Sequence, residues 1–202
     1  LVEKLIPRVE SLKIGPYTAG EDVDFGPIVT KEALARIKGL VDRGVEEGAE
    51  LKVDGRGFSL QGYESGNFMG GCLFDRVTRD MDIYRTEIFG PVLSVVRARS
   101  YEEGLSLAMD HEYGNGAAIF TRDGDAARDF ASRINIGMVG INVPIPVPLA
   151  YHTFGGWKKS AFGDLNQHGP DAFRFYTRAK TVTARWPSGV KEGAEFSIPT
   201  MG

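Results

Sequence analysis

Apolar residues recur at helical spacing near the start of the chain and predict two amphipathic helices. The first apolar face consists of Val2, Leu5, Ile6, Val9 and Leu12. Pro7 interrupts this face, so it must lie in the first turn of the helix or kink it. The second apolar face consists of Ala33, Leu34, Ile37, Leu40, Val41 and Val45. Thr30 is expected to cap this second helix and Gly48 to end it.

Short apolar segments then alternate with helical patterns. The segments expected to be extended are Glu50–Val53, residues 68–77, Val92–Val96, residues 117–121 and residues 137–143. Ser100 and Glu103 form a capping box for one intervening helix, which is expected to bury Leu105. Asp125 is expected to cap another helix that ends near Ile134. This alternation across short loops predicts an α/β domain with a largely parallel sheet.

The pattern changes after the last of these strands. Prolines alternate with aliphatic residues over residues 144–149, which excludes a helix and a central strand. This stiff apolar loop could cover an edge of the core or form the wall of a pocket, and both interpretations stay open. A short helix is expected over residues 169–175. Residues 180–186, from Lys180 to Trp186, alternate as a strand does, and we expect this strand to join a sheet elsewhere or in another subunit.

Composition narrows the class of protein. The chain has 202 residues, 42% of them hydrophobic, which is enough for one sizeable core. Its net charge of -3 provides no basic face, so neither nucleic acid nor a membrane is an expected partner. The single cysteine, Cys72, excludes an internal disulfide and a cysteine zinc site, and the three histidines lack metal-ligand spacing. No metal site is therefore expected.

Several stretches, taken together and in order, resemble aldehyde dehydrogenases. They are Gly66-Asn67-Phe68, Leu73-Phe74-Asp75, Glu87-Ile88-Phe89-Gly90-Pro91, Tyr113-Gly114, Ala118-Ile119-Phe120-Thr121, Gly140-Ile141-Asn142, Phe154-Gly155-Gly156, Ser160 and Phe162-Gly163. A narrower resemblance is to the coenzyme-A-acylating methylmalonate-semialdehyde dehydrogenases. It is carried by residues 111–116, by the proline-alternating run at residues 139–148 and by residues 175–186. The resemblance covers nearly the whole chain.

The resemblance implies the chemistry of a longer parent enzyme. Such enzymes oxidise malonate or methylmalonate semialdehyde with NAD, through a thioester on a cysteine. Carbon dioxide is lost, and the acyl group leaves on coenzyme A as acetyl- or propionyl-CoA. The resemblance also implies a homo-oligomer, a dimer or tetramer, joined through the strand at residues 180–186. The bacterial cytoplasm is the expected compartment, and the mitochondrial matrix is left open.

The resemblance also implies two cofactor-binding residues. Glu87 would bind the nicotinamide ribose hydroxyls, for which a carboxylate is suited because charge-assisted hydrogen bonds are strong. Phe89 would contact the nicotinamide ring. The alternative for Glu87 is a turn carboxylate that caps a helix or pairs with Arg85, and the alternative for Phe89 is a core aromatic.

The aldehyde pocket is implied to include four residues of the proline-rich region and the segment after it. They are Asn142, Val143, Pro144 and Phe154. Simple packing of the loop is the alternative for each of them. Lys158 and Lys159 are expected to form a solvated face, with a contact to a coenzyme A phosphate as the weaker alternative.

No residue of this chain is expected to be catalytic. Cys72 follows two glycines and precedes Leu73 and Phe74, with no histidine near it in sequence, so a buried and unreactive thiol is expected. In the family, the attacking cysteine and the dinucleotide-binding half lie before the segment that resembles this chain. The chain opens at Leu1 inside a predicted helix, without an initiator methionine, and is therefore expected to be a fragment that is inactive by itself.

The expected organisation has three parts. Residues 1–178 form a partial aldehyde dehydrogenase catalytic domain, incomplete at its N-terminus, residues 179–187 an oligomerisation strand, and residues 188–202 a tail. Two other functions stay open. One is a stand-alone interaction module that uses residues 180–186, and the other is a thiol enzyme in which Cys72 works with a distant histidine.

Overall fold

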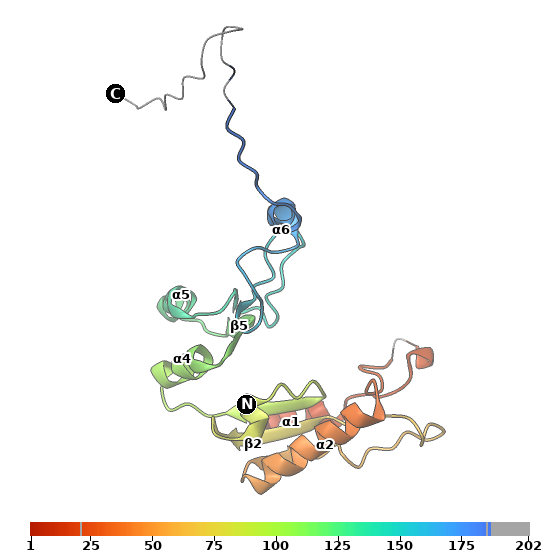
Figure 1. Cartoon of the computed structure of the whole chain (residues 1–202). Helices are drawn as coiled ribbons and strands as arrows, with labels where there is room; N and C mark the ends of the chain where they lie inside the picture. The colour runs from red at the N-terminus through yellow and green to blue at the C-terminus, as the bar shows by residue number, and fades with distance from the viewer. Residues whose placement is uncertain (21, 185, 187–202) are drawn as a thin grey trace.

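The computed structural model describes residues 1–20, 22–184 and 186 (Figure 1). The helices are α1 (Val2–Glu10), α2 (Lys31–Glu46), α3 (Asp82–Arg85), α4 (Tyr101–Asp110), α5 (Gly124–Arg133) and α6 (Ala172–Tyr176), with 3-10 turns η1 (Tyr17–Ala19) and η2 (Gly169–Asp171). The strands are β1 (Glu50–Val53), β2 (Cys72–Val77), β3 (Val92–Val96), β4 (Tyr113–Gly114), β5 (Gly116–Ile119), β6 (Met138–Ile141) and β7 (Trp157–Lys158). The α/β class predicted from the pattern is confirmed.

The first body is a three-stranded sheet in the order β1-β2-β3. β1 pairs with β2 antiparallel, and β2 pairs with β3 in parallel, with Cys72 opposite Val92. α2 packs against this sheet, and Figure 1 shows it lying across the strands. The core contains Ile37 and Val41 of α2 and Phe74 of β2, all fully buried. β2 is the central strand of this sheet, and five of its six residues are buried, Asp75 among them.

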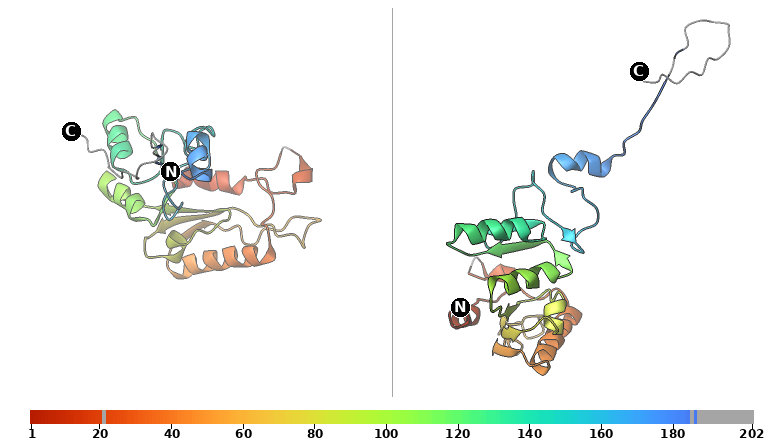
Figure 2. Two further views of the ribbon diagram at one scale, coloured as in Figure 1. Left: turned by 45° about the horizontal axis from the view of Figure 1, so that its top comes forward. Right: turned by 90° about the vertical axis from the view of Figure 1, so that its left-hand side faces the viewer.

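The second body is the parallel pair β5–β6, with α4 and α5 packed against it. Its smaller core joins Leu105 of α4 to Phe130 of α5 and to Ile134 and Ile136, which precede β6. Figure 2 shows this pair and its helices beside the first body. The parallel strands are thus distributed over two sheets.

A third ladder, β4–β7, is short and antiparallel, with Tyr113 opposite Lys158. After α6 the chain leaves the body, as Figure 1 shows, and residues 177–184 form neither helix nor strand. Residues 180–184 and 186 of the predicted strand form no strand within the described part of the chain. Residues 185 and 187 of the predicted 179–187 element and the whole 188–202 tail lie outside the described residues. The role of the predicted strand in oligomerisation stays a prediction.

Helix starts agree well with the sequence, with one correction. Thr30 caps α2 by accepting a hydrogen bond from the Ala33 amide, and Ser100 caps α4 by accepting from Glu103. The α5 cap is Asp123, whose carboxylate accepts from the amides of residues 125 and 126, so the prediction of Asp125 was wrong. Both aspartates fit a cap pattern, and Thr121 decides between them because its hydroxyl accepts from the Asp123 amide and so orders the turn.

One of the two alternatives for Pro7 is wrong, and one packing expectation is also wrong. Pro7 lies beyond the first turn, inside α1, where the missing amide removes one intrahelical hydrogen bond, and the alternative of a kink stays a prediction. Val45 is exposed, and Gly44 takes the buried position instead, because Ile83 and Phe74 lie directly against its backbone. None of the helices within residues 1–20, 22–184 and 186 combines the length and the apolar character needed to cross a bilayer.

Candidate functional site

The turn of residues 87–91 is held from two sides. Ile88 is buried in the first core, and its carbonyl accepts a hydrogen bond from the Arg36 guanidinium at 2.8 Å. Gly90 lies so close to α2 that a Cβ there would stand 2.7 Å from Cδ1 of Ile37. These contacts anchor the even-numbered residues of the turn and leave Glu87 and Phe89 exposed.

Phe89 has an unusual conformation for an aromatic residue. Its φ angle is +53°, in the left-handed region, and its side chain is 79% exposed. A bulky residue with positive φ is strained, and such strain persists only where the surrounding structure imposes it. The alternative of a core aromatic is therefore wrong for Phe89. Its ring is presented to the outside of the turn.

Glu87 opens onto a cavity of about 580 Å³ between the first body and the β4–β7 ladder. The cavity is lined by Tyr84, Thr86, Glu87, His111, Tyr113, Asn115, Lys159 and Ser160. Its walls are a mixture of aromatic rings and hydrogen-bonding groups. His111 lies edge-on to Tyr84, with ring centroids 5.4 Å apart. An exposed carboxylate at the rim of such a cavity can accept hydrogen bonds from a polyol, while the rings offer flat apolar surface.

The far wall of this cavity is formed by two short segments that hydrogen bonds join. The Lys159 amide donates to the Glu112 carbonyl, and the Gly114 amide donates to Oγ of Ser160. The Lys159 ammonium also pairs with the Glu112 carboxylate, and this hydrogen bond raises the pKa of Lys159 and lowers the pKa of Glu112. The wall is thus fixed by backbone and side-chain bonds together.

Lys158 is not part of a solvated face, and that expectation was wrong. Its ammonium donates to the carbonyl oxygens of Met109 at 2.6 Å and His111 at 3.0 Å. Lys159 is exposed, as expected, but is paired with Glu112. The contact of either lysine with a coenzyme A phosphate stays a prediction.

The four residues predicted to line the aldehyde pocket lie apart from the Glu87 cavity. Asn142 follows β6 with a φ of +58°, and its side-chain amide bonds both the amide and the carbonyl of Thr121. It thereby ties the ends of β5 and β6 together. Val143 and Pro144 are exposed, and the ring of Phe154 lies against His168 at 4.6 Å. Their role in a pocket stays a prediction.

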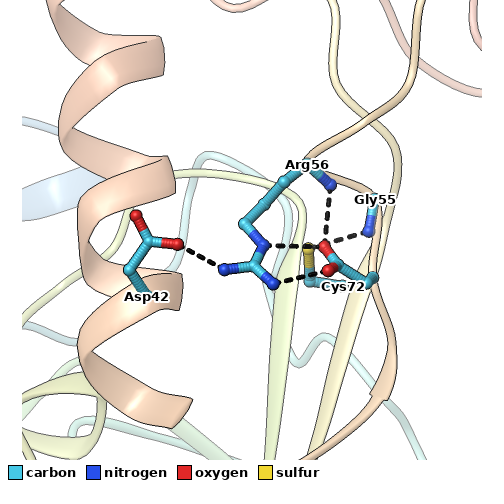
Figure 3. Close-up of polar contacts among 5 residues, drawn as sticks. Asp42, Gly55, Arg56 and Cys72 are labelled. Atoms are coloured by element: carbon cyan, nitrogen blue, oxygen red, sulfur yellow. Dashed lines mark hydrogen bonds and ion pairs between the residues drawn. The ribbon is translucent and has the colours of Figure 1, made fainter. Parts of the chain in front are cut away.

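Cys72 is enclosed as expected. Its side chain is 1% exposed, and Sγ accepts a hydrogen bond from the Gly55 amide at 3.3 Å. Figure 3 shows that the neighbouring Arg56 is engaged by carboxylates, among them Asp42. Burial raises the pKa of the Cys72 thiol, which disfavours the reactive thiolate. This environment supports an inert thiol.

Sequence reasoning missed most of the cavity around Glu87. His111, Tyr113 and Ser160 lie in stretches that carried the family resemblance, but nothing local showed that they face Glu87. They meet because β4 pairs with β7 across more than 40 residues of chain. These two strands have only two residues each and are too short to be recognised as strands in the sequence. Their pairing, and so this arrangement, could not be predicted.

Known proteins match this sequence over nearly the whole chain. The sequence profile of the aldehyde dehydrogenase family matches residues 1–182. A malonate-semialdehyde dehydrogenase of Pseudomonas aeruginosa is 57% identical over the whole chain, which spans 40% of that protein. An acylating, mitochondrial methylmalonate-semialdehyde dehydrogenase of Arabidopsis thaliana is 46% identical over 98% of the chain, which spans 32% of that protein.

A solved structure agrees with these relatives. It is a protein of Sinorhizobium meliloti 1021, assigned as a methylmalonate-semialdehyde dehydrogenase and crystallised with NAD. It is 74% identical, with a TM-score of 0.87, over 95% of this chain and 39% of its own. The chain spans between 32% and 40% of the length of these three relatives.

Proposed function

The chain belongs to the aldehyde dehydrogenase family, and we propose that it forms the C-terminal part of an NAD-dependent, coenzyme-A-acylating malonate- or methylmalonate-semialdehyde dehydrogenase. The relatives with these names match nearly all of the chain, and a relative at 74% identity binds NAD in its crystal. The proposed reaction gives acetyl- or propionyl-CoA, carbon dioxide and NADH. The attacking cysteine belongs to the part of the enzyme outside this chain.

The observation that carries the proposal is the turn of residues 87–91. Its buried residues fix the backbone, and its exposed carboxylate stands at the rim of an open cavity. We assign Glu87 to the two hydroxyls of the nicotinamide ribose, because an ionised carboxylate can accept from both at once. Phe89, exposed on the same turn, is assigned to the nicotinamide ring.

NAD, when bound, accepts the hydride of the aldehyde carbon. The residues of this chain orient that exchange and shape its surroundings. Glu87 holds the ribose, Phe89 limits the motion of the ring, and the apolar proline-rich loop of residues 144–149 keeps water from one side of the aldehyde site. Asn142, Val143, Pro144 and Phe154 are proposed to line this site once the rest of the enzyme is present.

The test is the Glu87→Gln substitution in the full-length enzyme. Loss of the charge should weaken NADH binding by about 10- to 150-fold, because hydrogen bonds to charged groups contribute about 1.5–3 kcal/mol. Fluorescence titration of NADH measures the effect. The matched control is Asp80→Asn, which removes the charge of an exposed carboxylate near the start of α3. It should leave NADH binding unchanged. Equal affinity in Glu87→Gln and the native enzyme would refute the assignment.

The second proposed function is an interaction module, favoured by the unpaired run after α6. Residues 177–184 are exposed and form no strand within the described chain, so their backbone groups are free to pair with another subunit. The purified 202-residue chain should then oxidise no semialdehyde but should self-associate. Sedimentation over a wide concentration range checks this, and a clean monomer at all concentrations argues against the association.

A further inference from the structure

Helix α4 ends without the local interactions that usually satisfy the last carbonyl groups of a helix. It has no basic residue in its last turn, and His111, which follows it, has an extended backbone with a φ of -65° and a ψ of 141°. The last carbonyl groups of a helix lack partners within the helix and carry partial negative charge. Here side chains from two distant elements supply those partners. Tyr84 of α3 donates its hydroxyl to the Leu107 carbonyl, and Lys158 of β7 donates to Met109 and His111.

The backbone at Lys158 has a strained conformation. Its φ is +53°, a conformation that non-glycine residues rarely adopt and that requires support from the surrounding structure. Its aliphatic stem lies over Gly114, where an added Cβ would stand 3.2 Å from the Cδ of Lys158. The strained backbone and the missing Cβ both serve to bring the ammonium to the end of α4.

The same helix end is joined to the segment that carries Glu87. His111 receives a hydrogen bond from the Tyr113 amide on Nδ1, at 3.2 Å. Its other ring nitrogen, Nε2, therefore carries the proton and donates to the Tyr84 carbonyl at 3.3 Å. Tyr84 precedes Glu87 by three residues. The C-terminus of α4 is thus the point where β7, β4 and the Glu87 segment meet.

We propose that Lys158 is a positioning residue of the cofactor site. By capping the carbonyls of Met109 and His111, its ammonium fixes His111 between Tyr84 and Tyr113, and so sets the distance between Glu87 and the β4–β7 wall of the cavity. The inference rests on the proposed role of Glu87 in binding the nicotinamide ribose. It assigns to Lys158 no contact with cofactor or substrate.

The test is the Lys158→Met substitution in the full-length enzyme, which keeps the apolar stem and removes the charged donor. The affinities for NADH and for ADP, which lacks the nicotinamide ribose, are measured side by side. A misplacement of about 1 Å can cost about 100-fold in rate, and we expect a smaller loss here, with NADH binding about 10-fold more weakly. ADP binding should be unchanged. Lys31→Met, an exposed lysine at the start of α2, is the matched control and should change neither affinity.

Two further variants keep the test decisive. Lys158→Arg retains a cation with several donors and should bind NADH better than Lys158→Met, whereas equal loss in both contradicts the role of the charge. If Lys158→Met fails to fold, Lys158→Gln, which keeps an N–H donor on a shorter stem, is measured instead with the same expectation. A parallel weakening of NADH and ADP in these variants would mean general damage to the fold and would overturn the proposal.

The outcome is separable from that of the proposed function. If Glu87→Gln weakens NADH binding and Lys158→Met does not, only the positioning role of Lys158 fails. If Glu87→Gln has no effect, the assignment of Glu87 fails first, and with it the premise of this inference.

Discussion

The two bodies of the chain differ in how completely they bury their own apolar side chains. In the first, Ile37, Val41 and Phe74 have no exposed surface, and the sheet is covered by α1 on one side and α2 on the other. The core of the second is smaller, and in the segment after β7, which belongs to neither body, Phe162 is 97% exposed.

This contrast separates the part of the chain that stabilises the fold from the parts that complete the candidate site. The first body holds the turn of residues 87–91 rigid because the turn is built into a closed core. The β4–β7 ladder supplies the wall of the cavity opposite Glu87, and residues 144–149 form a largely exposed apolar loop. We infer that the first body determines whether the chain folds, and that the β4–β7 ladder contributes to the candidate site. The following substitutions test this division, starting with the largest effect.

Phe74→Ala should have the largest effect. Phe74 is fully buried at the centre of the first core, and truncation of a buried phenylalanine costs about 3–5 kcal/mol through lost contacts and the cavity left behind. Urea unfolding measures the loss. Phe162→Ala, at an exposed position in the segment after β7, is the control and should change the free energy of unfolding by less than about 0.5 kcal/mol. Similar losses in both variants would contradict the distinction between the closed first core and the exposed segment after β7.

Asp75→Asn should have the next largest effect. Asp75 is the one buried charged residue among the described positions, and it accepts two hydrogen bonds from Arg97, at 2.9 and 2.7 Å. Loss of the charge should lower the free energy of unfolding by about 1.5–3 kcal/mol.

The same carboxylate predicts a pH dependence. The Arg97 hydrogen bonds lower the pKa of Asp75 to about 2, below its value of about 4 in the unfolded chain. Its contribution is therefore complete above about pH 4 and is lost as the pH falls towards 2. The native chain should lose more stability than Asp75→Asn between about pH 4 and pH 2. Equal acid sensitivity of the two chains would contradict this assignment.

Cys72→Ala should have the smallest effect of the three. The thiol fills little volume, and its single hydrogen bond is to the Gly55 amide, so we expect a loss of about 1 kcal/mol. In the full-length enzyme this variant should retain most of its activity. Near-total loss of activity in a folded variant would instead identify Cys72 as a nucleophile.

The sequence allowed prediction of features that depend on neighbouring residues. The caps at Thr30 and Ser100 and the strand Val92–Val96 were found because their signals are local. The exposed carboxylate of Glu87 was also located through its motif. The choice between Asp123 and Asp125 failed because both satisfy the same cap pattern.

Features that depend on distant contacts were not predictable in this way. Lys158 reaches carbonyls 47 and 49 residues earlier in the chain, and no pattern of charge or periodicity signals such a contact. The same holds for the pairing of His111 with Tyr84. The division of the strands among three sheets likewise follows from spatial packing that the alternation of strands and helices leaves open.

The close approach of Gly90 to Ile37 has an evolutionary consequence. Three atoms of the fully buried Ile37 side chain lie within 3.0 Å of where a Cβ on residue 90 would stand, so neither position can gain volume alone. A bulkier residue at position 37 would therefore displace the same turn as an alanine at position 90. Related sequences should show these two sites changing jointly or not at all. On the proposed role of Glu87, a shift of α2 against the turn would change the affinity for the cofactor.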